Sequence, residues 1–535
     1  MKKKSKRRAA IKRIRQTKKR IDKANWNGQS PMIHTPDIKL EIAERNQAIS
    51  HGGLATIQQL VRQIGLADLI NKHCPILKLY LPFSEADHVL NIAFNLLAGG
   101  NCLEHIEHRR NDPAFLDALD AQRIPDPTTA GDFCRRFSHQ DVLNLQHAFN
   151  QARLKVWRQQ PDEFLDTAVI EADGTIVETA AEKKAGIGLS YKGQWGYHPL
   201  VVTLANTREV LFLENRSGNR PSHENAAGYY DRAAHLCREA GFRNILFKGD
   251  TDFSQTTELD RWDDAGYQFV FGIDAMPNLV SLAEAIPEDQ WRLLDRKKNK
   301  QEAASEGERS AGKSRTKRPI IRRRSKRVNS KEEFVVAKGY ENKRLEREFV
   351  AEFPYCPTAC DRDYRVVVVW KELSIHRGQL HLFDDVKCFF YITNQPKTVP
   401  AAAVVRQANQ RCDQENIIAQ LKSFGALSVP LHDLVSNEAY MVMASLAWNL
   451  KSWLGLSLSE SCEADEGEPT EGEERRLTKR RIVRMDFATF RQELISIPAQ
   501  IVRSGRQLIY RFLTVVPGVL TLLSLHESVS GRLLE

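Results

Sequence analysis

The chain has 535 residues, of which 42% are hydrophobic, and a formal net charge of +10. A chain of this size and apolarity can bury a large core, which excludes a disordered protein and predicts roughly three or four domains. Its longest apolar stretch, 512–525, is too short to span a membrane, and no apolar signal segment follows Met1. Nine cysteines without a paired pattern indicate reduced thiols. We therefore expect a cytoplasmic, nucleoid-associated protein with no membrane partner.

The positive charge is concentrated in two segments. Residues 1–23 hold thirteen Lys or Arg and one acid, and residues 292–331 hold sixteen basic and four acidic side chains. Each segment contributes +12, so the rest of the chain is acidic, near −14. Basic segments on an acidic body favour a polyanion as partner, because Lys and Arg release counterions condensed on a phosphate backbone. Each segment taken alone is more typical of a solvated face or a localisation signal.

The first folded region is predicted to be helical. After a basic arm (1–50), residues 51–160 carry apolar side chains at helical spacing, one run of them behind the candidate N-cap Ser84. A short helix near the end of this region is expected to point Phe133 and Phe137 inward. A helix-turn-helix and an ordinary helical bundle both fit this pattern. We interpret residues 51–160 as a helical DNA-binding domain.

Residues 161–280 predict the first part of an α/β core. Short β-branched and aromatic runs alternate with helical stretches in the order β-β-β-α-β-α-β, a meander followed by βα alternation. This order matches a mixed sheet of the RNase H-like kind. The expected strands are 168–173, 199–205, 210–214, 245–250 and 268–273, and the expected helices are 225–240 and 256–264.

The second part of the core is predicted at 396–458, after a basic linker and a β-rich insertion at 281–395. Within the insertion, 307–314 satisfies the phosphate-loop pattern G-x-x-x-x-G-K-S. We reject that site because charged flanks replace the strand and the helix that such a loop requires. The lone pair Cys356 and Cys360 does not predict a zinc site.

The remaining sequence predicts one long helix, a linker and a terminal domain. Apolar residues at 440–454 indicate a helix buried against the core. The segment 459–484 is acidic and then basic, and we expect a flexible charged linker there. Residues 485–535 are expected to form a C-terminal helical region.

Three distant carboxylates form the candidate catalytic and metal-binding site. Asp173 in E-A-D-G-T and Asp250 in K-G-D-T-D-F each end a predicted strand, where a carboxylate at the rim of a sheet can reach a metal. Strand alternation directs Glu171 toward the same face as Asp173, as a further ligand or a supporting group. Taken singly, each aspartate is better explained as a loop cap or turn residue, and only the combination favours a site.

Glu415, the third carboxylate, lies in a predicted helix. Arg411 precedes it by four residues and Lys422 follows it by seven, so at ~100° per residue all three share one face. Arg411 and Glu415 could form only a surface ion pair, worth about 0.2–0.5 kcal/mol. The combination of an acid for hard divalent cations with cations for phosphates favours metal-dependent chemistry on a nucleic acid.

These motifs together resemble the DDE transposases of bacterial insertion sequences. The spacing of Arg411, Glu415 and Lys422 matches their Tyr-Arg-Glu-Lys signature, and K-G-D-T-D-F resembles their second-aspartate motif. E-A-D-G-T with Y-K-G-Q-W-G-Y-H-P-L resembles the first-aspartate segment of the insertion-sequence family numbered thirteen-eighty, and I-P-A-Q-I-V-R-S-G-R-Q-L-I-Y-R-F-L is similar to that family too. The resemblance is dense over about 165–455. Ala408 stands where the signature has Tyr, which affects a DNA-positioning contact and not a metal ligand.

The resemblance implies an RNase H-like mixed-sheet core that is interrupted by a β-rich insertion, and a DNA transposase. The enzyme would bind the terminal inverted repeats of its element, cleave the DNA and join it to target DNA. Asp173, Asp250 and Glu415 would hold two Mg²⁺ ions, with Mn²⁺ able to substitute, and Arg411 and Lys422 would bind DNA. We expect a homodimer on double-stranded DNA in the active complex.

Two other functions fit the same residues. A metal-dependent nuclease could use the carboxylates without strand transfer, and a DNA-binding protein could have lost catalysis. By resemblance, Trp370 of the insertion could stack on a flipped base. Its place at the end of a strand run favours a core position instead.

Overall fold

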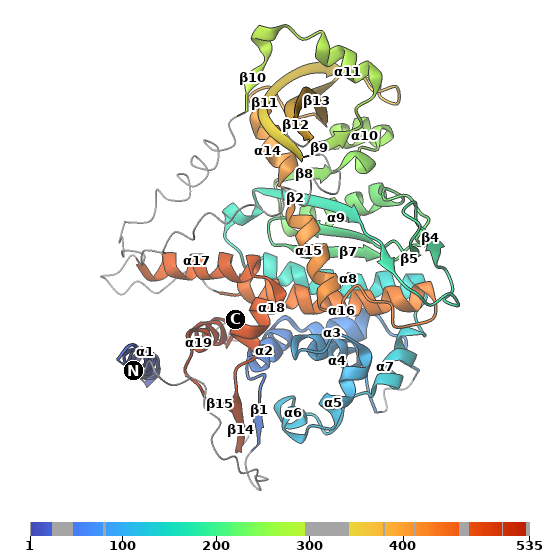
Figure 1. The fold of residues 1–535 in the computed structure, drawn as a ribbon. Coiled ribbons are helices and arrows are strands. Elements are labelled where there is room, and N and C mark those ends of the chain that lie inside the picture. The colour runs from blue at the N-terminus through green and yellow to red at the C-terminus, as the bar shows by residue number, and fades with distance from the viewer. Residues whose placement is uncertain are drawn as a thin grey trace. The chain divides into compact units, whose positions relative to one another are not determined.

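The computed structural model describes residues 2–23, 47–78, 82–294, 342–377, 380–410, 412–458, 470–505 and 507–530 (Figure 1). The chain divides into two compact units. The first is Met1–Asn244 with Asp413–Glu535, and the second is Ile245–Cys412. The rejected phosphate-loop match, most of the second basic segment and Arg411 lie outside the described residues.

Helices make up the N-terminal part of the first unit. Ser84 caps its helix as predicted, because its hydroxyl accepts from the amide of Asp87 while the Asp87 carboxylate accepts from the amide of Ser84 at 2.8 Å. Phe133 and Phe137 are both buried, with their rings edge to face at 5.2 Å. The helices are α1 (Lys2–Asp22), α2 (Leu54–Ile64), α3 (Leu66–His73), α4 (Glu85–Leu97), α5 (Ile106–Arg110), α6 (Pro113–Ala118), α7 (Pro127–Cys134) and α8 (His139–Trp157).

A three-stranded antiparallel meander follows these helices, as the strand order predicted. It consists of β2 (Thr167–Gly174), β6 (Leu200–Leu204) and β7 (Glu209–Glu214), which are neighbours in that order. The helix α9 (Ala226–Ala240) packs against all three strands. A second small sheet, which the sequence did not predict, lies between β2 and β6 in the chain: β3 (Val177–Glu178), β4 (Gly188–Leu189) and β5 (Trp195–Tyr197).

The long helix α16 (Leu434–Leu456) forms the centre of the first unit. Every residue from Ser436 to Leu456 is buried, which confirms the helix predicted at 440–454. It contacts α4, α7, α8 and strand β7, so α7 belongs to a helical bundle. A helix that is buried on all sides and largely apolar is expected where other elements surround it completely.

A buried ion pair joins three elements of this core. The guanidinium of Arg153 on α8 donates to the carboxylate of Glu209 on β7 at 2.8 Å, and both side chains are 0% exposed. The same carboxylate accepts from the indole N–H of Trp157 at 2.9 Å and of Trp453 on α16 at 2.5 Å. Both Glu209 oxygens therefore have donors, which compensates part of the cost of removing the charges from water.

The C-terminal part differs from the helical region that the sequence predicted. Residues of the expected flexible linker form α17 (Thr470–Arg484), which packs against α16. Residues 499–512 form a hairpin of β14 (Ala499–Ser504) and β15 (Gln507–Phe512), and β14 also pairs with β1 (Ala48–Ile49). Ile501 is buried in a small cluster with Ile49, Ala114 and Ala118, so burial against distant residues decided in favour of strands. The rest is α18 (Phe487–Phe490), a π-helical turn η6 (Arg491–Ile495) and α19 (Pro517–Ser530).

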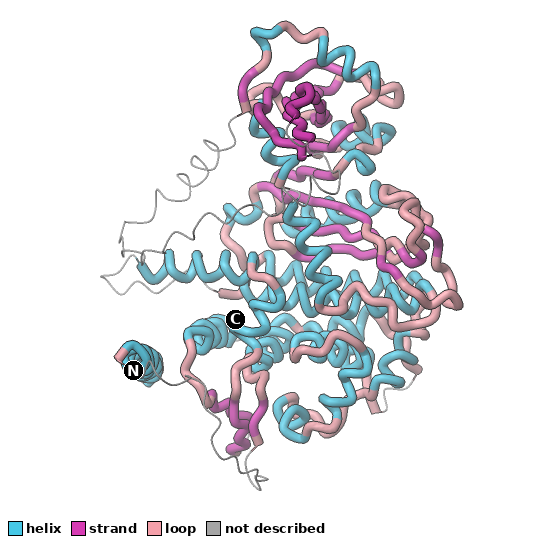
Figure 2. The backbone as a smooth tube through the Cα atoms, in the orientation of Figure 1, coloured by secondary structure: helices cyan, strands magenta, loops and turns pink. Residues whose placement is uncertain are grey.

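The second unit contains a mixed sheet (Figure 2). Its strands β8 (Asn244–Gly249) and β9 (Gln268–Ile273) are parallel, and the crossover between them carries α10 (Leu259–Asp264). The long strands of the insertion are antiparallel, and β13 pairs with β9, so the insertion extends this sheet. These strands are β11 (Asn342–Tyr355), β12 (Tyr364–Arg377) and β13 (Leu380–Thr393). The short strand β10 (Arg292–Leu293) pairs with β11 and forms the edge of the sheet. The helix α14 (Ala401–Asn409) packs on β9, β11, β12 and β13, and α11 (Pro277–Glu284) contacts β11.

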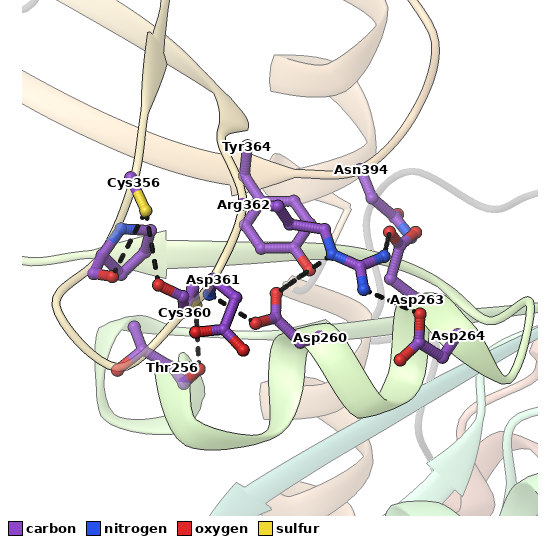
Figure 3. Close-up of polar contacts among 11 residues, drawn as sticks. Thr256, Asp260, Asp263, Asp264, Cys356, Cys360, Asp361, Arg362, Tyr364 and Asn394 are labelled. Carbon is purple, nitrogen blue, oxygen red and sulfur yellow. Dashed lines mark hydrogen bonds and ion pairs between the residues drawn. The ribbon is translucent and has the colours of Figure 1, made fainter.

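The turn between β11 and β12 is held to α10 by charged groups. Figure 3 shows the guanidinium of Arg362 among three carboxylates, with distances of 3.6 Å to Asp260, 3.0 Å to Asp263 and 2.8 Å to Asp264. The hydroxyl of Tyr364 also donates to Asp260 at 2.5 Å. These contacts attach the insertion to the crossover of the α/β core.

The insertion cysteines and Trp370 have structural surroundings. The thiol of Cys360 donates to the carbonyl of Thr256 at 3.1 Å, and the thiol of Cys356 donates to the carbonyl of Cys360 at 3.4 Å (Figure 3). Trp370 is half-buried in β12, with its ring edge to face against Trp291 at 5.6 Å. Its register partners are Phe349 on β11 and Cys388 on β13, so it lies inside the sheet with its side chain only partly buried.

Candidate functional site

Asp173 lies near the carboxyl end of β2, one residue before Gly174. A side chain at position 174 would place its Cβ 2.6 Å from the imidazole Nε2 of His198, so the close packing requires glycine after the aspartate. The Nδ1–H of His198 donates to the carbonyl of Arg220 at 2.8 Å, which fixes the ring. The motif E-A-D-G-T therefore combines a strand-end carboxylate with a tight contact to His198, which lies between β5 and β6.

Glu171 precedes Asp173 by two residues in the same continuous strand. Its side chain is 1% exposed. Because side chains alternate along a strand, both carboxylates belong to the same face of β2. On the neighbouring strand β6, Thr203 is the register partner of Glu171 and Val201 is that of Asp173.

The helix that carries Glu415 is attached to β6 at this register. In α15 (Cys412–Ser423), the buried Gln414 donates from its amide to the carbonyl of Val201 at 2.9 Å and accepts a hydrogen bond from the hydroxyl of Thr203. Gln414 directly precedes Glu415, which is exposed in the first turn of the helix. The first turn of α15 is therefore fixed next to the strand pair that carries Asp173.

Lys422 lies at the other end of α15 and close to Asp173. Its ammonium donates to the carbonyl of Ile176, three residues after Asp173, at 2.7 Å. Partial removal of water lowers the pKa of Lys422, and the nearby Asp173 carboxylate acts in the opposite direction. Seven residues turn a helix by nearly two full turns, so Glu415 and Lys422 share one face about 10 Å apart along the axis.

The other members of the predicted signature are placed differently. Arg411 lies outside the part of the chain that the structure describes. Ala408 belongs to α14 of the second unit, where it is buried. Of the three residues expected on one helix face, the structure describes Glu415 and Lys422.

Asp250 follows β8 of the second unit and opens a tight turn. Its carboxylate accepts from the amide of Asp252 at 3.2 Å, and Phe253 of the same motif is fully buried. A Cβ on Gly249 would lie 2.6 Å from the Cβ of Phe253, and one on Gly272 of β9 would lie 2.9 Å from the amide of Thr251. The motif K-G-D-T-D-F thus packs its turn closely against β9 and leaves the carboxylate at the end of the parallel strand.

Asp173 and Glu415 belong to the first unit and Asp250 to the second. Over the described ranges, no group of three or more His, Cys, Asp or Glu side chains is gathered in a way that could hold a metal ion. The joint site of three carboxylates stays a prediction. Their oxygen donors are of the type that Mg²⁺ and Mn²⁺ prefer.

Sequence reasoning missed two polar residues of the site, Gln414 and His198. Both are buried. Both stand inside motifs that were recognised, in D-Q-E-N and in G-Y-H-P-L. Their polar side chains inside these motifs were the available signal for a structural role. The sequence does not name their hydrogen-bond partners, because these lie elsewhere in the chain.

Residues 32–471 match the family described as Transposase DDE domain group 1. The chain belongs to this DDE transposase family. The matched range includes Asp173, Asp250, Glu415 and Lys422. The narrower resemblance to the insertion-sequence family numbered thirteen-eighty stays a prediction.

Among solved structures, this DDE transposase is similar to one described as a piggyBac transposase synaptic complex with hairpin DNA. The identity is 9%, the similarity covers 84% of each chain, and the TM-score is 0.29. No curated protein matches the chain. In the described part of the transposase, none of the helices has both the length and the apolarity needed to cross a membrane.

Proposed function

We propose that this DDE transposase binds the terminal inverted repeats of its own mobile element, cleaves the DNA at the element ends and joins the freed 3′ hydroxyls to target DNA. Family membership over residues 32–471 supports the reaction class. The observation that carries the assignment of residues is the position of Lys422, whose ammonium lies beside Asp173 and the chain that follows it. A cation beside a strand-end carboxylate provides a contact for a phosphate next to a metal ligand.

The proposed metal ligands are Asp173, Asp250 and Glu415. Two Mg²⁺ ions, or Mn²⁺ in their place, would activate the attacking water or 3′ hydroxyl and stabilise the leaving oxygen. The packed turn after β8 limits the movement of Asp250, and the hydrogen bonds of Gln414 fix the helix turn that carries Glu415. The proposal assigns Glu171 to a supporting position on the face of Asp173.

Lys422 and Arg411 are assigned to the DNA backbone. The hydrogen bond of Lys422 to the Ile176 carbonyl uses one of three ammonium donors, so the others can reach a phosphate. The proposed partner is double-stranded DNA, as element ends and as target, with a homodimer as the active form. The proposal places the protein on the nucleoid of the cytoplasm.

The carboxylate assignment is tested by the single substitutions Asp173→Ala, Asp250→Ala and Glu415→Ala. Each is expected to abolish Mg²⁺-dependent cleavage of end-containing DNA while the protein still binds that DNA. The matched control is Asp413→Ala, which removes an exposed carboxylate from the same helix turn as Glu415. Full cleavage activity in any of the three variants would reject the site.

The strand-transfer step is tested with a pre-cleaved DNA end that carries a free 3′ hydroxyl. The wild-type chain is expected to join this end to a target duplex. Cleavage without joining would assign the chain to the metal-dependent nucleases. DNA binding with neither reaction would assign it to proteins that have lost catalysis.

The role of Lys422 is tested with Lys422→Gln. Loss of one phosphate contact reduces the slope of log K against log salt by about 0.9. An unchanged slope would restrict Lys422 to its contact with the Ile176 carbonyl.

A further inference from the structure

A basic groove of the first unit is lined by none of the three predicted carboxylates. Its volume is about 950 Å³, and α17 forms one side, while Pro161, Phe164, Asn206 and Thr207 line the other. Five of the six charged residues that line the groove are basic. These charged residues are Glu163, Arg476, Lys479, Arg480, Arg481 and Arg484.

The C-terminal end of α17 is fixed in place by buried cations. The ammonium of Lys451 on α16, 0% exposed, donates to the carbonyls of Val483 at 3.0 Å and Met485 at 2.8 Å. The guanidinium of Arg208 donates to the carbonyl of Arg484 at 2.7 Å. These groups satisfy carbonyls that a helix end leaves without an intrahelical partner.

The two helices also approach closely, as Figure 1 shows for α16 and α17. A Cβ at Gly455 of α16 would lie 3.1 Å from the methyl groups of both Ile482 and Val483. Ile482 and Val483 are buried, whereas Arg480 and Arg484 are exposed. One face of α17 therefore packs on α16, and a basic face is left outward.

The outward cations form a row along the helix. Arg476, Arg480 and Arg484 recur every fourth residue, so they lie on one face over about 12 Å. Arg481 pairs with Glu493, whereas within the described ranges none of the three residues of the row forms an ion pair. Like charges four residues apart destabilise a helix, so the row reduces the stability of α17 when nothing anionic is bound.

Helix stabilisation explains only part of this charge. Cations in the last turn interact favourably with the negative end of the helix dipole, but the effect fades beyond that turn. Arg484 is in the last turn of α17, whereas Arg476 and Arg480 are not. An external anion accounts for all three positions.

We propose that the outer face of α17, formed by Arg476, Arg480 and Arg484, binds the sugar-phosphate backbone of duplex DNA. The inference rests on the proposed function, because it gives the transposase a DNA contact outside its carboxylate site. Duplex DNA carries one charge per ~1.7 Å of axis, so a row about 12 Å long faces several phosphates. Each exposed guanidinium group on this fixed helix can donate two parallel N–H hydrogen bonds to one phosphate.

The test uses the full chain, a non-specific duplex oligonucleotide and the charge-removing triple variant R476Q/R480Q/R484Q. Affinity is measured over a range of salt concentrations. Loss of three phosphate contacts is expected to reduce the slope of log K against log salt by about 2.7. The charge-retaining variant R476K/R480K/R484K is expected to keep the wild-type slope. The single variant R480Q is expected to reduce the slope by about 0.9, and it replaces the triple variant in the test if the triple variant does not fold.

The matched control is Arg503→Gln. Arg503 is exposed but already paired with Asp117 at 3.4 Å and Asp120 at 2.7 Å, so its loss is expected to leave the slope unchanged. An unchanged slope in both charge-removing variants, with intact wild-type binding, would overturn the α17 assignment alone. Altered self-association with unchanged DNA binding would assign the row to a protein contact and would overturn it too. A wild-type chain that binds no duplex would also overturn the proposed function.

Discussion

Replacing Glu209 by Gln is expected to destabilise the first unit strongly. The substitution keeps the shape of the side chain but removes the charge that faces the guanidinium of Arg153, which is 0% exposed. The new amide nitrogen is also a donor in a place where Arg153, Trp157 and Trp453 all donate. The variant thus leaves the buried guanidinium of Arg153 without a counter-charge and places the amide donor of Gln against other hydrogen-bond donors.

The expected loss is about 3–5 kcal/mol, the usual cost of removing one partner of a buried ion pair. Protein stabilities are roughly 5–15 kcal/mol, so this loss is a large share of the total. Urea unfolding, followed by tryptophan fluorescence, measures it. Trp157 and Trp453 contact the substituted group and report the change locally.

A double-mutant cycle with Arg153→Met separates the charge from the shape. In E209Q/R153M the buried cation is gone, and the Gln carbonyl can still accept from an indole N–H. The double variant is therefore expected to be less destabilised than the sum of the two single variants, by about 1–3 kcal/mol. A loss below about 1 kcal/mol in E209Q, or additive losses in the cycle, would refute the assigned role of the pair.

Three other variants test separate parts of the chain. Burial lowers the pKa of His88 from 6.5 to about 4, so its contribution to stability is present above pH 6.5 and is lost as the pH falls toward 4. Between pH 7 and pH 5 the wild type should lose about 2 kcal/mol more unfolding free energy than His88→Gln, because the variant has no imidazole to protonate. Gly249→Ala forces its Cβ against Phe253 and displaces the Asp250 turn, so DNA cleavage should fall by about 100-fold. Gly228→Ala, where a Cβ meets nothing within 4 Å, should cleave normally. Ala408→Tyr introduces the signature residue at a buried position of α14 and should cost about 1–3 kcal/mol in urea unfolding, whereas a stable variant with stronger DNA binding would contradict this.

The sequence predicted what local periodicity and capping control. Alternation and β-branched runs gave the meander of β2, β6 and β7 and the parallel pair β8 and β9. Ser84 marked a helix start because its capping partner is only three residues away. The strand-end positions of Asp173 and Asp250 follow from the same local patterns.

Tertiary contacts decided the features whose partners are distant in the chain. Gln414 bonds to Val201, more than two hundred residues earlier, and Lys422 reaches Ile176 across a similar separation. The segment 499–512 forms a strand pair because β14 meets β1 and buries Ile501, whereas the sequence predicts a helical region over 485–535. Residues 470–484 are helical against α16, where their charge had predicted a flexible linker.

What the sequence alone determined is therefore the type of chemistry: carboxylates at strand ends, a helix with Glu415 and Lys422 on one face, and two basic segments. Tertiary structure decided that Lys422 lies beside Asp173 and that α17 turns a basic face outward. The physical reason is that strand and helix patterns depend on neighbours within a few residues. The partner of a buried hydrogen bond or of a packed helix face is chosen only when distant segments meet.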